Sequence, residues 1–295
     1  MEAMSKKWGQ SPLLILLLIV LLVGCRNPKI DTDSQQKTPP NKEERITLAG
    51  NRQIPYKLDK EYIYAFKTDK GDVGRGTFKI EELKSETGDI YKKISSSVDI
   101  NDKSNGRITK GSSTLTIDYH HSILHYQRQS FGEYRDNPES NGTEKIKFEI
   151  DPEWFHSMGG YRIFLLNIEG PKDRENGKFA TQLPFIIELP EGGFIFDNNF
   201  LGLMAYICSQ PELKAGRTEI LKVLSVNLHR MITIKMNPKI KVELNYKGKK
   251  IISYEVDMKA DDATFGRYFI TPNGVLLKAE EMSGMMLIEL TNPDI

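Results

Sequence analysis

The chain has 295 residues, of which 39% are hydrophobic and 27% are charged. This is an ordinary globular composition, which excludes a fibrous repeat, a wholly disordered chain and a multi-span membrane protein. Lysine and arginine together number 41 against 40 acidic residues, so the chain has no overall field that would hold DNA, RNA or an anionic bilayer. We therefore expect no nucleic-acid partner.

The N-terminus has the layout of an export signal. Lys6 and Lys7 precede eleven uninterrupted apolar residues from Leu13 to Val23, and Gly24 and Cys25 follow. A membrane-spanning helix needs roughly 20 apolar residues, so this run is too short for permanent insertion. We predict that residues 1–24 are a signal peptide.

The sequence Leu22-Val23-Gly24-Cys25 resembles the lipobox of bacterial lipoproteins. In that family the cysteine thiol receives a diacylglycerol, the signal is cut before the cysteine, and the new amine is usually acylated. The resemblance implies that Cys25 is lipidated and binds the exported chain to a membrane. Arg26 is not the aspartate that retains enterobacterial lipoproteins in the inner membrane, which favours the periplasmic face of the outer membrane in a cell with two membranes. Two alternatives remain: a simple secretory signal with an incidental cysteine, or a short membrane anchor.

The mature chain would contain one other thiol, Cys208, so it could form no intrachain disulfide. Residues 25–44 are rich in polar side chains, with Pro39 and Pro40 adjacent. Such a segment cannot bury enough apolar surface to offset its ordering entropy. We interpret it as a flexible tether between the lipid and a β-rich domain over residues 45–295.

Beyond the tether, short runs of β-branched and aromatic residues alternate with turn signals, a pattern typical of antiparallel sheet. In the clearest case, Ile146, Phe148 and Ile150 share one face of a strand that is polar on the other face. Strands of the N-terminal group are predicted to begin at or near Glu61, Gly76, Ile90, Ser113, Ile123, Glu144, Tyr161 and Phe185.

A helix is predicted over residues 198–210, with Asp197 or Asn198 as its N-cap and its end before Pro211. Its apolar residues leave little polar face, so the helix must be covered by other elements.

The chain then returns to strands, at residues 220–227, 231–237, 239–246, 249–258, 266–270, 275–282 and 285–290. Asn273-Gly274 between two apolar runs is the strongest hairpin signal. The strands form two antiparallel groups, at 45–196 and 218–292, which could be two sheets joined by the helix.

This order of helix start, paired strands and closing turns resembles bacterial exported proteins with a curved half-barrel sheet, including the lipoprotein-carrier and outer-membrane lipoprotein-receptor families. The resemblance covers roughly residues 55–292 and includes no catalytic motif. It implies a mainly β fold, with a curved antiparallel sheet and one apolar helix on the concave face.

The sequence has no recognisable nucleophile motif, phosphate-binding loop or metal-binding pattern. On one strand, His121 and His125 would lie about 13 Å apart while His120 faces the other way, so the three could not share a zinc ion. We expect no enzyme activity, no metal and no cofactor.

Two functions remain open. The first is binding of an apolar or lipid-like ligand. The helix would then act as a displaceable or partial plug, and Phe200, Leu203, Met204 and Ile207 would line the ligand site. The second is an envelope-assembly interaction lipoprotein with a filled core and a partner at a sheet edge.

Overall fold

The computed structural model describes residues 43–103, 106–135, 141–150, 161–172, 179–190, 192–197, 200–228, 230–246, 248–281 and 286–292. In the described residues, the strands that precede the helix are β1 (Glu43–Ile46), β2 (Glu61–Thr68), β3 (Gly71–Lys84), β4 (Ile90–Asp102), β5 (Arg107–Asp118), β6 (Ile123–Tyr134), β7 (Gly142–Ile150), β8 (Tyr161–Lys172), β9 (Phe179–Pro190) and β10 (Phe194–Phe196). Helix α2 (Leu201–Ser209) follows, and then β11 (Arg217–Ser225), β12 (Arg230–Tyr246), β13 (Lys249–Ala260), β14 (Ala263–Ile270), β15 (Leu276–Glu281) and β16 (Leu287–Leu290).

These strands form one continuous sheet, with the order β1-β11-β12-β13-β14-β15-β16-β2-β3-β4-β5-β6-β7-β8-β9 and with β10 paired to β11. Neighbouring strands are antiparallel, except that β1 and β10 both run parallel to β11. The two predicted groups meet where β16 pairs with β2, from Leu287 opposite Lys67 to Leu290 opposite Tyr64. They are therefore joined in a single sheet.

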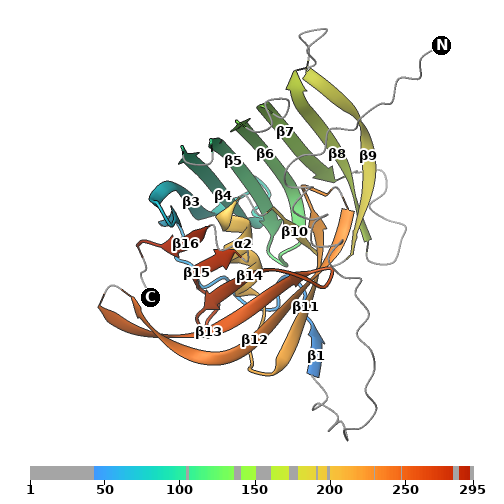
Figure 1. The fold of residues 1–295 in the computed structure, drawn as a ribbon. Coiled ribbons are helices and arrows are strands. Elements are labelled where there is room, and N and C mark those ends of the chain that lie inside the picture. Colours follow the sequence, from blue (N-terminus) through green and yellow to red (C-terminus); the bar gives the residue numbers. More distant parts are fainter. Residues whose placement is uncertain are drawn as a thin grey trace, which may run out of the picture.

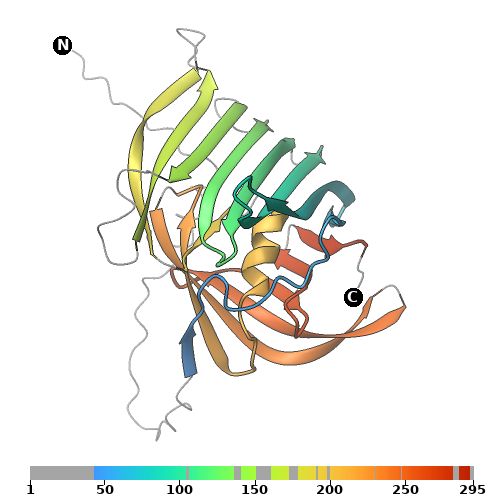
Figure 2. The same ribbon diagram turned by 180° about the vertical axis from the view of Figure 1, so that it is seen from behind.

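The sheet curves around α2, as the two opposite views show (Figure 1, Figure 2). Alternation along the strands explains why the concave face of the sheet is apolar. On β2, Tyr62, Tyr64 and Phe66 are buried, and the residues between them are partly exposed. Ile146 and Phe148 are buried as predicted. The predicted fold class, a mainly β protein with a curved antiparallel sheet and an apolar helix on its concave face, is confirmed.

Helix α2 packs against β3, β4, β10 and β15. All nine of its residues are buried, as expected for a helix without a polar face. Because its sides contact strands that are far apart in the sequence, α2 supplies the centre of the core.

The predicted N-cap is wrong. The helix begins after Phe200, whose backbone is extended, and no side chain caps it. Asp197 is fully buried, and its carboxylate accepts hydrogen bonds from Tyr126 and Arg128 of β6 instead. A carboxylate without exposed surface needs a nearby cation, and that need outweighs the local preference for capping.

The Asn273-Gly274 turn is confirmed as the connection between β14 and β15, where the Gly274 amide donates to the Thr271 carbonyl at 2.8 Å. Gly274 has a φ of +96°, and a Cβ there would lie 2.8 Å from the Cα of Ser209. Glycine is therefore required for the turn and for its contact with the end of α2.

Candidate functional site

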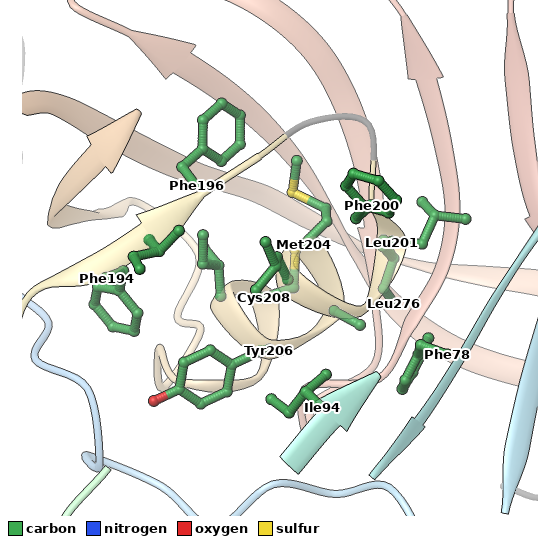
Figure 3. Packing of buried hydrophobic residues seen from close by; sticks show 14 of the residues in the cluster. Phe78, Ile94, Phe194, Phe196, Phe200, Leu201, Met204, Tyr206, Cys208 and Leu276 are labelled. Carbon is green, nitrogen blue, oxygen red and sulfur yellow. The ribbon is translucent and has the colours of Figure 1, made fainter. Parts of the chain in front are cut away.

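The four residues proposed to line an apolar site lie along α2 and the residue before it. Phe200, Leu203, Met204 and Ile207 have exposed fractions of 0%, 1%, 4% and 0%. Figure 3 shows Phe200 and Met204 among side chains from the surrounding strands, including Phe196 and Leu276. The structure therefore brings the four together, but their surfaces are already covered by the protein. Cys25, the predicted lipidation site, lies outside the described residues.

Close packing of α2 against the sheet depends on a glycine. A Cβ on Gly202 would lie 2.9 Å from the Cβ of Phe78 in β3 and 3.0 Å from Cγ2 of Ile94 in β4. It would also overlap the hydroxyl of Ser96. The helix backbone thus lies directly on β3 and β4, and no side chain at position 202 separates them.

The C-terminal end of α2 is held by a buried glutamine. The Gln210 side-chain carbonyl accepts a hydrogen bond from the Gly50 amide at 2.9 Å, and the Gln210 main-chain carbonyl accepts one from Asn51 at 3.1 Å. The Gln210 amide donates to Ser209, whose hydroxyl donates in turn to the Tyr206 carbonyl at 2.7 Å. These contacts fix the helix end to the segment between β1 and β2.

A charged cluster holds the segment that leads into α2. Arg128 donates to Asp197 at 2.7 Å and to the side-chain carbonyl of Asn227 at 2.6 Å, and it forms an ion pair with Glu144 of β7. Tyr126 donates to the same Asp197 oxygen at 2.8 Å. The cluster therefore connects β6 and β7 to the residues on either side of β11 and α2.

The electrostatics of this cluster keep the arginine charged. Burial alone would lower the pKa of Arg128, but the carboxylates of Asp197 and Glu144 raise it above its ordinary value. The side chain of Arg128 is 5% exposed and that of Asp197 is 0% exposed, so the pair is largely removed from water. Breaking it would leave a buried charge without its counter-ion.

Sequence reasoning missed this cluster, although one signal was present. Tyr126 and Arg128 are two residues apart on β6 and therefore share the inward face of the sheet. A basic residue at an inward position requires a buried acid. Which acid meets it depends on the tertiary fold, because Asp197 is 69 residues away.

A second polar contact involves His121 and Tyr206 of α2. The Nδ1 atom of His121 lies 3.3 Å from the Tyr206 hydroxyl, and the histidine is buried in the turn between β5 and β6. Burial, with a smaller contribution from Lys92, lowers the pKa of His121 to about 4. The imidazole is therefore neutral at neutral pH.

The remaining candidates for chemistry do not assemble into a site. Burial raises the pKa of Cys208 well above its ordinary value, so this thiol is not a ready nucleophile. His120 is exposed and His125 lies on the outer face of β6, and the two do not converge with His121. No group of three or more metal-ligating side chains was found in the part of the chain that the structure describes.

No family model and no curated protein matches the sequence. Among solved structures, the fold is similar to a crystal structure described as a beta-barrel-like protein of a domain of unknown function, DUF1849, from Brucella abortus. The identity is 11%, the TM-score is 0.45, and the match covers 79% of this chain and 95% of that chain. Within the described ranges, no helix is long and apolar enough to cross a membrane.

Proposed function

We propose that this protein is an exported lipoprotein, anchored to a membrane through Cys25, that acts without catalysis as an interaction protein of the cell envelope. The observation that carries the choice between the two candidate functions is the complete burial of α2, from Leu201 to Ser209. A helix packed on all sides is an integral part of the core.

The energetics support this choice. A ligand that reached Phe200, Leu203, Met204 and Ile207 would first have to displace protein side chains from them. Burial stabilises each such side chain by about 1.5–3 kcal/mol, so exposing all four costs roughly 6–12 kcal/mol. That is comparable with the whole stability of a typical domain, about 5–15 kcal/mol.

The polar contacts at both ends add to this cost. Withdrawal of α2 would separate Gln210 from Gly50 and Asn51, and it would disturb the Asp197–Arg128 pair. Buried polar groups that lose their partners are destabilising by about 1–3 kcal/mol each. These features favour a helix that stays fixed in the core over a displaceable plug. A partner would then bind outside the core.

The anchor is tested by metabolic labelling with palmitate in the native host. We expect label in the wild-type protein and in Cys208→Ala, which retains the lipobox cysteine, and no label in Cys25→Ala. A labelled Cys25→Ala protein would refute anchoring through this residue.

The fixed helix is tested with Cys208, which is the only thiol left in the Cys25→Ala chain. A maleimide should react with it at the rate set by global unfolding, and native mass spectrometry of the purified protein should show the mass of the polypeptide alone. Met204→Glu should unfold the protein, because it places a charge at a buried position. Rapid labelling under native conditions, a bound lipid, and a folded Met204→Glu variant with weaker lipid binding would instead establish the apolar-ligand function.

A further inference from the structure

The outer face of strands β3 to β6 carries a distinctive set of side chains, and the inner face of β3 and β4 packs on α2. Two adjacent cross-strand rows consist of hydroxyl and amide residues over three or four successive strands. The first row is Thr77, Ser97, Ser112 and Gln129, and the second is Ser95, Thr114 and Gln127. We name these seven residues the hydroxyl–amide grid.

The grid contains no charged side chain. Lysines lie at its ends: Lys145 pairs with Gln129, Lys147 pairs with Gln127, and Lys79 pairs with Ser95. Neighbouring strands are about 4.8 Å apart, and alternate residues along a strand are about 6.8 Å apart. The grid is therefore a regular array of short polar side chains on a continuous sheet surface.

The rest of the sheet shows that this composition is not a general property of the outer surface. Strands β12 to β15 and the turn after β13 carry charges of both signs there, joined in the ion pairs Lys235–Asp262, Lys239–Asp257, Arg267–Glu255 and Lys278–Glu280. Charged side chains are a common means of keeping an exposed sheet soluble. The rows on either side of the grid are charged in the same way, with Asp99 paired to Lys110 on one side and Glu81 paired to Lys93 on the other. The uncharged surface is therefore confined to the two rows of the grid.

An exposed aromatic residue lies at the margin of the grid. Phe131 follows Gln129 by two residues on β6, on the same outer face, and it is 38% exposed. Next to it in the cross-strand direction are Lys110 and Thr143. The ring therefore presents an apolar surface beside the dense hydroxyl and amide groups.

We propose that this face binds a neutral glycan. Hydroxyl and amide side chains both donate and accept hydrogen bonds, as sugar hydroxyl and acetamido groups require, and they need no counter-charge. The Phe131 ring offers a surface for the apolar C–H face of a sugar. The inference rests on the proposed function and names the class of partner that the interaction protein would bind.

Other partners fit this face less well. An anionic polymer would require a concentration of unneutralised cations, whereas Lys79 and Lys110 beside the grid are paired with Glu81 and Asp99. A protein partner would be expected to meet an apolar, aromatic centre within a polar rim. Here the centre is polar, and the exposed ring of Phe131 lies at the edge.

The test uses the purified mature chain, residues 25–295, with calorimetric titration of two probes, a hexamer of N-acetylglucosamine and a hexamer of glucose. We expect saturable binding of at least one probe. The double variant Gln127→Ala/Gln129→Ala should weaken that binding about tenfold or more, because each lost hydrogen bond is worth about 1 kcal/mol. Phe131→Ala should weaken it as well.

The matched control is Lys235→Ala/Lys239→Ala on β12, which changes two side chains of the charged outer surface and should leave binding unchanged. Circular dichroism verifies that all variants are folded. Absence of binding to both probes, or equal binding by wild type and the double variant, would overturn the proposal. So would a photo-cross-linker at position 129 that captures a protein in cells. These results are independent of palmitate labelling and of Cys208 reactivity, so failure of the glycan site is distinguishable from failure of the proposed function.

Discussion

The buried pair between Arg128 and Asp197 provides the most stringent test of how the helix is held. We expect Arg128→Met to destabilise the protein by about 3–5 kcal/mol, the usual cost of removing one partner from a buried ion pair. The reason lies in the geometry: the Asp197 side chain is 0% exposed and its bond to the guanidinium is 2.7 Å long. The remaining carboxylate has no route to water without opening the structure around the start of α2.

The assay is equilibrium unfolding in urea, followed by circular dichroism, with the free energy of unfolding extrapolated to water. The double variant Arg128→Met/Asp197→Leu should recover most of the loss, because replacing both charges by apolar side chains removes the uncompensated charge. Lys239→Met is the control, since it removes a surface cation whose side chain is 44% exposed. It should cost less than about 1 kcal/mol. The pair does not stabilise the start of α2 if Arg128→Met lowers the free energy of unfolding no more than this control does. The same conclusion follows if the double variant is no more stable than Arg128→Met.

Three further predictions concern α2 and its contacts. Gly202→Ala should destabilise the protein by about 1–3 kcal/mol in urea unfolding, because overlap with β3 and β4 outweighs the better helix propensity of alanine; an unchanged midpoint would contradict the close packing. His121 has a pKa of about 4 in the folded protein, below its ordinary value of 6.5. Its stabilising contribution should be complete above pH 6.5 and be lost as the pH falls toward 4, and His121→Asn, which tolerates the φ of 62° at this position, should remove that part of the pH dependence. Cys208→Ser should lower the free energy of unfolding by about 1–3 kcal/mol, since it places a hydroxyl in an apolar, fully buried position; equal stability of the two proteins would show that the site is accessible to water.

The sequence indicated most of the individual strands because alternation is a local property of the chain. Tyr62, Tyr64 and Phe66 lie on one face of a strand whatever that strand pairs with, and the glycine of the Asn273-Gly274 turn supplies the positive φ within two residues. The apolar character of residues 200–208 likewise required that the helix be covered. All of these inferences depend on neighbours that are close in the sequence.

The tertiary structure decided how these elements meet. The pairing of Tyr64 with Leu290 joins the two strand groups into one sheet, and it connects residues from opposite ends of the domain. The role of Asp197 was decided in the same way. The local sequence favours a helix cap, but the carboxylate is completely buried and accepts a hydrogen bond from Arg128. Local patterns fix which face of an element is apolar, whereas the identity of a distant partner depends on the packing of the whole chain, because burial sets the free energy of each polar group.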